Sequence, residues 1–363
     1  MPKLKIDYWF LLSVILLSAI GTATIFSASP TMGLKYGDML FYIKRHLLFL
    51  VLGVGAGFYG FYLDLAKLKK VSPHLFLFSL IFLILVFIPG IGHNISGASR
   101  WIDLGILSFQ PSELIKFTLT VYLAKMLSEK KANIGDFIKG VLPALLIFVF
   151  VAALIIKQPD LGTVLALAGS VFGMLFVAGM EYSQFVFLGL FAVAGVIVLG
   201  VTSAYRLKRF LAFFDPWQDP QGIGFQIIQS LLAVGSGGIL GLGLGASRQK
   251  FFYLPQQFTD FIFAIHCEET GFIGAFVVIS IYVLFAHRGF LIALGAKEQF
   301  KSLLATGLVA WLTTQAMINI MVVVGLVPTT GIPLPFISYG GTATIINLFT
   351  VGVILNISKK GSA

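Results

Sequence analysis

The residue whose type and position most suggest chemistry is Asp260, which stands where the polar segment LPQQFT gives way to the apolar run FIFAI. A carboxylate at the boundary between water and lipid is partly desolvated, which raises its pKa and suits it to act as a general base. Asp is also favoured at the start of a helix, where Thr259 could share the capping role. Taken alone, the position favours a helix cap over catalysis.

Basic side chains in neighbouring polar segments could bind an anionic group such as a lipid phosphate or pyrophosphate, which Arg forks and Lys ammonium groups recognise. Alternatively, these residues anchor the chain at the level of the lipid headgroups. The sequence shows no motif for a tightly bound cofactor and no cluster of metal ligands, and a divalent cation, magnesium or manganese, is compatible with such a site. The candidate substrate-binding residues are Lys44, Arg45, Arg100, Lys157, Asp160, Arg206, Arg248, Lys250 and Ser338.

Two charged residues, Glu113 and Lys116, lie in the first two turns of an apolar run that Pro111 opens. A lone charge near the centre of a bilayer costs about 2.5–3.5 kcal/mol on insertion scales. The spacing of three residues lets the two side chains meet on one helix face. We therefore favour a structural ion pair over a direct role in chemistry.

Glu268 and Glu269 follow Asp260 by about two helical turns. At 100° per residue, Glu269 points opposite Asp260 and Glu268 lies about 80° from it, so the two cannot both pair with Asp260. Acids inside a membrane are functional by default. A structural partner for at least one of them is nevertheless expected.

The elements that position these residues are apolar helices. The chain is 58% hydrophobic and only 11% charged, whereas a soluble domain has roughly 45–50% apolar and about 25% charged residues. The composition indicates an all-α integral membrane protein, with residues 1–363 as a single polytopic domain. Ten runs approach the length of about 20 residues that a spanning helix needs, and they lie at about 8–28, 46–63, 73–90, 111–127, 138–156, 161–179, 184–202, 261–285, 302–327 and 337–356.

The distribution of basic residues predicts the orientation, because cytoplasmic loops carry an excess of Lys and Arg. It places both termini in the cytoplasm and three larger polar segments, 29–45, 91–110 and 203–261, on the outer face. The last is a large loop between the seventh and eighth helices, and it holds five basic residues that the rule does not explain. The net charge of +10 reflects this topology and not nucleic-acid binding.

Two segments have unusual backbone requirements. The glycine-rich stretch 235–247, GSGGILGLGLGAS, predicts a re-entrant or closely packed helix that needs small residues. The stretch 328–341, PTTGIPLPFISYGG, predicts an irregular outward loop leading into the last span. Irregular backbone at this depth is tolerated only where it is buried in protein or lines a cavity.

These segments together resemble the FtsW/RodA family of SEDS proteins over essentially the whole chain. The motifs that carry the resemblance are SGASRWIDLG at 96–105, QPSELIK at 110–116, KQPDLGT at 157–163, DPWQDPQGIGFQIIQSLLAVGSGG at 215–238, RQKFFYLPQQFTDFIFAI at 248–265, EETGFIGA at 268–275 and VPTTGIPLPFISYGG at 327–341. The DPW, YLP and PTTG elements look more like the division or sporulation type than RodA.

The resemblance implies ten spans with cytoplasmic ends and a peptidoglycan glycosyltransferase of the cytoplasmic membrane that polymerises lipid II in cell division. The family's essential aspartate falls on Asp260, which moves our interpretation from cap to catalyst. The donor would be a polyprenyl-pyrophosphate-linked glycan. The expected partners are a class B penicillin-binding protein, which is a transpeptidase, and other division proteins.

The chain departs from the family pattern beside this site. Gln257 and Phe258 stand where the family usually has an acid and a His, and His266 and Cys267 where it has apolar residues or Gly. These departures bear on substrate detail and rate more than on reaction class.

Two other functions remain open at this point. A lipid II flippase would also use intramembrane charges and broken helices, but it needs a polar path through the midplane, whereas the polar residues here gather on the outer side. A non-enzymatic scaffold of the division machinery is the second alternative, and loss of activity in an Asp260 variant would exclude it.

Overall fold

The helices and strands described here come from a computed structural model that describes residues 6–359 except 91, 96–97, 104–107, 130–133, 203 and 251–256. The YLP element at 253–255 and part of the SGASRWIDLG motif therefore lie outside the described residues. In chain order, the α-helices are α1 (Tyr8–Ala28), α2 (Pro30–Gly33), α3 (Phe41–Tyr62), α4 (Leu65–Leu85), α5 (Pro111–Glu129), α6 (Leu142–Lys157), α7 (Leu161–Ala178), α8 (Tyr182–Val201), α9 (Ala204–Phe214), α10 (Phe225–Ser236), α11 (Ile262–Gly295), α12 (Gln299–Val323) and α13 (Gly341–Ser358).

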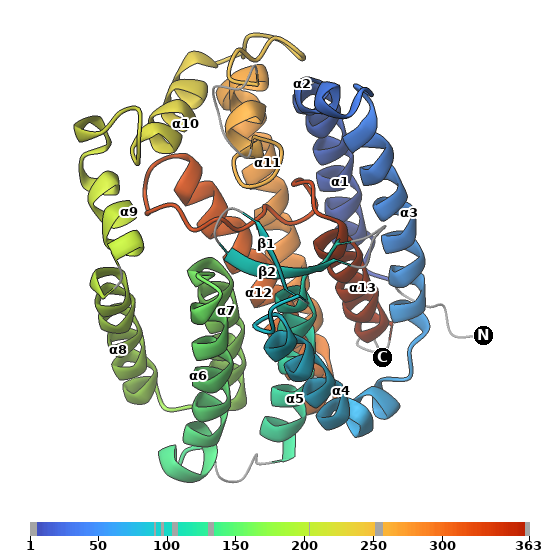
Figure 1. Cartoon of the computed structure of the whole chain (residues 1–363). Helices are drawn as coiled ribbons and strands as arrows, with labels where there is room; N and C mark the ends of the chain where they lie inside the picture. The colour runs from blue at the N-terminus through green and yellow to red at the C-terminus, as the bar shows by residue number, and fades with distance from the viewer. Residues whose placement is uncertain are drawn as a thin grey trace.

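Most of the long helices run between the two ends of a bundle (Figure 1). In that view α11, α12 and α13 lie towards the middle, α1 and α3 on one side, and α8 and α9 on the other. A short π-helical turn, η3 (Phe137–Val141), leads into α6. The 3₁₀ turns η1 (Leu34–Tyr36) and η4 (Pro216–Gln218) lie in the polar segments.

Eight helical segments of the described chain are long and apolar enough to cross a membrane. They are α1, α3, α4, η3 with α6, α7, α11, α12 and α13. The protein is therefore a multi-pass helical membrane protein, as the sequence predicts. The other two predicted spans coincide with α5, which carries Glu113, Lys116 and Lys125, and with α8, whose apolar part is Tyr182–Val198. The count of ten spans stays a prediction.

Small residues let two helices of the bundle approach closely. A Cβ atom added to Gly352 of α13 would lie only 2.0 Å from the carbonyl oxygen of Gly57 in α3. One added to Gly60 would lie 2.7 Å from the carbonyl oxygen of Phe349. Such contacts between backbones are typical of helices packed in lipid, where there is little hydrophobic force to drive association.

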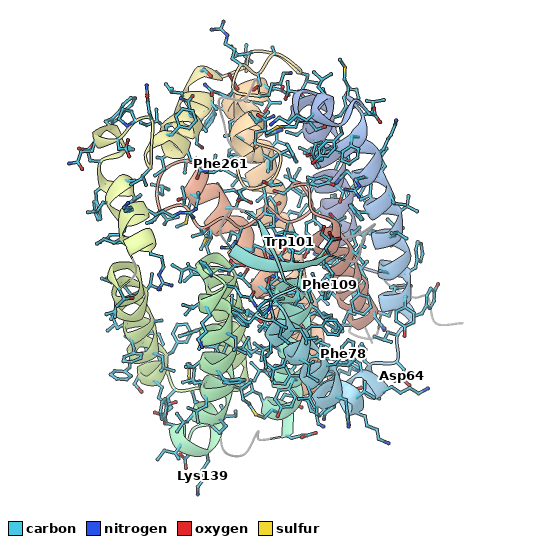
Figure 2. The ribbon with its side chains drawn as sticks, in the orientation of Figure 1. Asp64, Phe78, Trp101, Phe109, Lys139 and Phe261 are labelled. Carbon is cyan, nitrogen blue, oxygen red and sulfur yellow. The ribbon has the colours of Figure 1, made fainter. Side chains whose placement is uncertain are left out.

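The second predicted outer loop contains a small antiparallel sheet, which the all-α prediction missed. Its strands are β1 (Gly92–Ile95), β2 (Ala98–Asp103) and β3 (Ser108–Phe109), in the order β1–β2–β3. Gly92 pairs with Ile102, which in turn pairs with Phe109. The strands are too short for a periodic pattern to predict. Figure 2 shows Trp101 of β2 near mid-height of the molecule, below Phe261 and above Lys139.

The first part of the third predicted outer loop is largely helical. It contains α9, η4 and α10, and the glycine-rich stretch begins at the end of α10. The expected close packing is present beyond that helix, because a Cβ atom on Gly237 would lie 2.1 Å from the carbonyl oxygen of Cys267. Residues 239–249 form turns rather than helix.

The glycine segment is inserted into a break in α11. Gly271 has φ 66° and ψ −163°, a conformation that is accessible to glycine and interrupts the helix. Backbone amides of Leu242 and Gly243 donate to the carbonyl oxygens of Glu268 and Glu269, at 3.0 and 3.1 Å. The amides of residues 272 and 273 donate back to the carbonyl oxygens of residues 238 and 239. The break is thus satisfied by backbone hydrogen bonds to the glycine segment.

The segment 328–341 between α12 and α13 is irregular, as predicted, and much of it is buried in protein. Phe336 takes a positive φ of 67° within it. Side chains of α11 and α12 bind its carbonyl groups: Tyr282 donates to Pro335 and Gln315 to Pro333. This arrangement meets the requirement that backbone groups at this depth find partners within the protein.

Candidate active site

Asp260 lies two residues before the start of α11, in the turn that ends the partly described 203–261 segment. Its side chain is half-buried. Desolvation among the surrounding protein atoms raises the pKa of Asp260 to about 6. Among the described residues, none donates a hydrogen bond to its carboxylate. The carboxylate can therefore accept a proton near neutral pH without first giving up a protein partner.

Three charged side chains act on Asp260 electrostatically, and they come from separate parts of the chain. Arg100 of β2 and Arg209 of α9 lower its pKa, whereas Asp160 raises it. Arg100 donates to the carbonyl oxygen of Gln158 at 2.8 Å and also to that of Pro159. Arg209 donates to the carbonyl oxygen of Thr329 at 3.1 Å. The sequence predicted Arg100 and Asp160 as site residues but did not single out Arg209.

Asp160 has a clear local role as the N-cap of α7. Its Oδ1 accepts from the amide of Thr163 at 3.1 Å, and its Oδ2 accepts from the Thr163 hydroxyl at 2.9 Å. The cap fixes the KQPD turn, whose carbonyl groups bind Arg100. Asp160 therefore contributes both a negative charge near Asp260 and the fold of the turn that holds the cation.

The backbone around Asp260 is bound to the 328–341 segment and to α12. The amide of Tyr339 donates to the carbonyl oxygen of Phe258 at 2.9 Å. The Ser338 hydroxyl donates to the carbonyl oxygen of Thr259 at 2.5 Å, and the Asn319 side chain donates to the carbonyl oxygen of Asp260 at 2.7 Å. The segment also passes close to the carboxylate, since a Cβ atom on Gly331 would lie 3.6 Å from Asp260 Oδ2.

Four other predicted cations belong to α3, α6 and α9. Lys44 is exposed and pairs with Asp38 at 2.7 Å. The Arg45 guanidinium lies 5.0 Å from the centre of the Phe41 ring. Lys157, at the end of α6, is exposed, and Arg206 on α9 is half-buried. Substrate binding by these residues stays a prediction.

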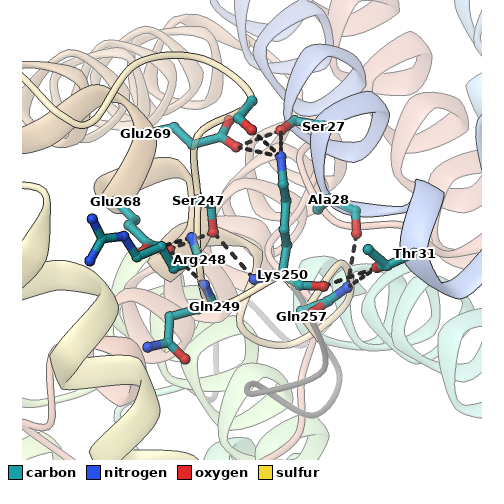
Figure 3. A network of polar contacts seen from close by, with 11 residues as sticks. Ser27, Ala28, Thr31, Ser247, Arg248, Gln249, Lys250, Gln257, Glu268 and Glu269 are labelled. Carbon is teal, nitrogen blue, oxygen red and sulfur yellow. Dashed lines mark hydrogen bonds and ion pairs between the residues drawn. The ribbon is translucent and has the colours of Figure 1, made fainter.

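Lys250 and Arg248 belong to a different cluster, which Figure 3 shows. The buried Lys250 ammonium lies 3.7 Å from Glu269 and donates to the carbonyl oxygen of Gly245. Arg248 has an exposed side chain, and its backbone amide donates to Glu268 at 3.0 Å. In Figure 3 the Arg248 guanidinium points away from the Glu269–Lys250 contact.

The two acids of α11 are both bound by protein groups, as expected for at least one of them. Glu269 accepts a 2.5 Å hydrogen bond from Ser27 of α1. Glu268 accepts from the Ser247 hydroxyl at 2.5 Å and from the amide of Gln249 at 3.3 Å. Both carboxylates are almost fully buried. They hold the turn 247–250 against α11 and α1.

Glu113 and Lys116 form the predicted ion pair, with 2.8 Å between the charged atoms and each side chain only 1% exposed. Lys116 also donates to Gln315 Oε1 at 2.8 Å, and Trp311 Nε1 donates to the same oxygen at 3.0 Å. Gln315 in turn donates to the carbonyl oxygen of Pro333 at 2.8 Å. The pair therefore joins α5, α12 and the 328–341 segment, which favours the structural interpretation.

The residues that depart from the family pattern are built into contacts with the N-terminal helices. Gln257 donates to the carbonyl oxygen of Ala28 at 2.9 Å. The Phe258 ring packs 4.6 Å from that of Tyr42, measured between centroids. His266 lies 3.5 Å from the Thr24 hydroxyl, and the thiol of Cys267 is buried. Gln257 and Phe258 thus join the segment before Asp260 to α1 and α3.

The comparisons with known proteins agree with this architecture. A family model for FtsW, RodA and SpoVE, described as cell cycle proteins, matches residues 8–363. The chain belongs to the FtsW/RodA/SpoVE family. The resemblance seen in the sequence is thereby confirmed.

Relatives of this family member match over nearly their whole lengths. Stage V sporulation protein E of Bacillus subtilis is 46% identical, with 98% of each chain covered. A probable peptidoglycan glycosyltransferase FtsW of Geobacter sp. strain M18 is 42% identical, with 98% of this chain and 97% of the relative covered.

Solved structures of the family are similar as well. A chain in a peptidoglycan synthase complex that coordinates polymerization and crosslinking has a TM-score of 0.82 and 32% identity, with 99% of each chain covered. The rod shape determining protein RodA of Thermus thermophilus has a TM-score of 0.73 and 29% identity, with 100% of each chain covered. The fold of this FtsW/RodA/SpoVE protein is therefore that of the family.

Proposed function

We propose that this peptidoglycan glycosyltransferase polymerises lipid II at the outer face of the cytoplasmic membrane, with Asp260 as the general base. The observation that supports the assignment most is the state of the Asp260 carboxylate. It is half-buried, its pKa is raised to about 6, and two guanidinium groups act on it. A base with a pKa just below the working pH is largely ionised and still accepts a proton readily.

The proposed reaction is an inverting glycosyl transfer. Asp260 takes the proton from the 4-hydroxyl of the acceptor's GlcNAc as that oxygen attacks the anomeric carbon of the donor glycan. The bond between this carbon and the pyrophosphate oxygen breaks, and its electron pair leaves with the polyprenyl pyrophosphate. One new glycosidic bond forms for each pyrophosphate released.

The leaving pyrophosphate gains negative charge in the transition state, so fixed positive charge nearby lowers the barrier. Arg100 and Arg209 are the cations whose charge reaches Asp260 most directly in the described structure. Lys44, Arg45, Lys157, Arg206 and Arg248 are proposed to bind substrate further from the reacting carbon. In the described part of the chain, no group of three His, Cys, Asp or Glu side chains could hold a metal ion. A magnesium or manganese ion that arrives with the pyrophosphate stays a proposal.

The proposed topology has ten spans, both ends in the cytoplasm and Asp260 on the outer side. The proposed partner is a class B penicillin-binding protein, a transpeptidase that crosslinks the glycan as it forms. One related structure is of a peptidoglycan synthase complex that couples polymerization with crosslinking, and relatives named FtsW support a role in division. A role in sporulation is favoured equally by the SpoVE relative.

The decisive experiment measures lipid II polymerisation by the purified protein in lipid vesicles, with and without the transpeptidase of the same organism. Wild-type protein should form glycan strands, and Asp260→Asn should form them about 10²–10⁴-fold more slowly while remaining folded and bound to its partner. Polymerisation by Asp260→Asn at close to the wild-type rate would remove Asp260 as the base. A flippase or a scaffold would then be the better interpretation.

A further inference from the structure

We infer that Asn319 of α12 is a positioning residue for Asp260, and that it acts by fixing the backbone on which the carboxylate is carried. The inference rests on the proposed function, because it concerns the same general base. Nothing in the sequence pattern distinguishes Asn319 from the other polar residues of this helix. Its role becomes visible only in the hydrogen bonds that it makes.

The Asn319 side chain bridges two segments that are far apart in the sequence. It is 1% exposed, and its amide nitrogen donates to the carbonyl oxygen of Asp260 at 2.7 Å and to that of Ile332 at 2.8 Å. An amide NH₂ group has two hydrogens, so this geometry uses both. The side chain therefore ties the turn before α11 to the 328–341 segment.

Asn319 completes a series of anchors on three consecutive residues. The carbonyl oxygens of Phe258, Thr259 and Asp260 accept hydrogen bonds from Tyr339, Ser338 and Asn319, respectively. The first two donors belong to the irregular segment itself. Only Asn319 belongs to a long helix. It is therefore the donor that fixes the position of Asp260 relative to the core of the bundle.

The helix that carries Asn319 is itself fixed at this level. Gln315, one turn earlier on the same face, donates to Pro333 and accepts from Lys116. Residues 332 and 333 are thus bound from α12 at adjacent positions, by two side-chain amides four residues apart. The buried Glu113–Lys116 pair supports this arrangement through Gln315, at a distance from the reacting groups.

Backbone anchoring matters here because the described residues donate no hydrogen bond to the Asp260 carboxylate. Its location is therefore set by the backbone and by the rotamer of one short side chain. A misplacement of about 1 Å can cost a catalytic group about 10²-fold in rate. Removal of the Asn319 donors should consequently lower the rate of the chemical step, with little effect on substrate affinity.

The test compares Asn319→Leu with a matched control, Asn356→Leu. The amide of Asn356 in α13 also bridges two carbonyl oxygens, those of Gly60 at 3.2 Å and Leu63 at 2.6 Å, but it lies at the far end of α3. Both substitutions remove two hydrogen bonds to backbone, so both should lower thermal stability. In vesicles with lipid II and the transpeptidase, we expect Asn319→Leu to lower kcat about 10–100-fold per folded molecule, with KM changed less than about twofold.

Two further readouts separate positioning from a general loss of structure. The lower pKa of the pH–rate profile should move in Asn319→Leu, because the environment of Asp260 changes, and should stay in place in Asn356→Leu. Asn319→Ser keeps one hydroxyl donor and should recover part of kcat. This variant also keeps the test usable if the Leu variant does not fold.

Three outcomes would overturn the inference: an unchanged kcat in Asn319→Leu, equal losses of kcat in the two Leu variants, or a raised KM with normal kcat, which would indicate a substrate contact. Asp260→Asn is measured in the same assay. If Asp260→Asn is inactive and Asn319→Leu is fully active, only this inference fails. If Asp260→Asn is active, both the proposed function and this inference fail.

Discussion

Asp260 and Glu268 are acids eight residues apart in the sequence, and their surroundings differ sharply. Glu268 is 1% exposed, and its two oxygens accept from the Ser247 hydroxyl and from the amides of Arg248 and Gln249. The Asp260 carboxylate is half-buried and has no such donor among the described residues. Protein groups thus fill the hydrogen-bonding capacity of Glu268, whereas the described residues leave the Asp260 carboxylate without a donor.

The contrast shows that depth in the membrane is a poor guide to the role of an acid. Intramembrane carboxylates are functional by default, yet Glu113, Glu268 and Glu269 are all more deeply buried than Asp260 and all have protein partners. The presence of protein partners is the better criterion, because a carboxylate that protein groups do not already bind can accept a hydrogen bond from a substrate hydroxyl.

The largest effect is expected at Asp260 itself. Asp260→Asn keeps the size of the side chain but cannot act as a base, so the rate of lipid II polymerisation should fall about 10²–10⁴-fold. The backbone anchors remain, so the melting temperature should change little. Thermal unfolding and polymerisation of the same preparation check both statements. A stable Asp260→Asn protein with an unchanged polymerisation rate would show that the unbound carboxylate of Asp260 is not needed for the reaction.

The Glu113–Lys116 pair should behave in the opposite way, with a large effect on stability. Replacing either residue by an apolar one strands a buried charge, which costs about 3–5 kcal/mol. The double change, Glu113→Leu with Lys116→Met, should recover part of the loss. Thermal unfolding of the four proteins measures this coupling. Full stability in both single variants with loss of activity would assign the pair to substrate or chemistry.

Glu268 should show the same pattern on a smaller scale. Glu268→Gln removes the charge that binds the turn 247–249 and should cost about 1.5–3 kcal/mol of stability. The rate per folded molecule should stay close to that of the wild type. A rate loss comparable to that of Asp260→Asn, without a loss of stability, would mean that bound oxygens do not exclude a role in chemistry.

The pH dependence follows from the raised pKa of Asp260. The base must be ionised, so kcat/KM should fall about tenfold per pH unit below about 6. The free energy of unfolding should instead rise as the pH falls from about 6 towards 4, because Asp260 binds a proton more tightly in the folded state than in the unfolded chain. A rate that stays constant down to pH 5 would contradict the assigned base.

The smallest effects are expected from basic residues further from Asp260. Arg206→Ala and Arg248→Ala should weaken the use of lipid II by a few fold, since charges in contact with solvent contribute about 0–1 kcal/mol each. The expected change is in KM, in folded protein. Arg209→Ala should have the larger effect because its charge acts on Asp260. Unchanged kinetics in Arg206→Ala and Arg248→Ala would exclude both residues from the site.

Much of the helical framework could be predicted from hydropathy. All ten predicted runs coincide with helices, and the run predicted at 8–28 has the bounds of α1. The end of α11 was placed about ten residues too early, at 285, because His287 and Arg288 lower the hydropathy of a helix that continues to Gly295. Arg288 instead pairs with Asp7 at 2.6 Å, beside the start of α1.

The candidate site was predictable only in part. The position and type of Asp260 singled it out, and the polar segments around Arg100 and Asp160 were expected on the same side. Arg209 and Asn319 were missed because a helical pattern does not show which turn of a distant segment a side chain will meet. The sheet of β1, β2 and β3 was missed for a related reason, since its strands are stabilised by pairing with one another and not by a periodic pattern.

The broken helix α11 has a consequence for how this end of the molecule can move. In a straight helix the carbonyl groups of Glu268 and Glu269 would accept from the amides four residues later, those of Phe272 and Ile273. Here the same four groups bond to the glycine segment instead. Straightening the helix would form two hydrogen bonds and release four, so the glycine segment and the helix can only change together. The amides of Phe272 and Ile273 should therefore exchange with deuterium at the rate at which that segment detaches, which makes them natural reporters of its opening.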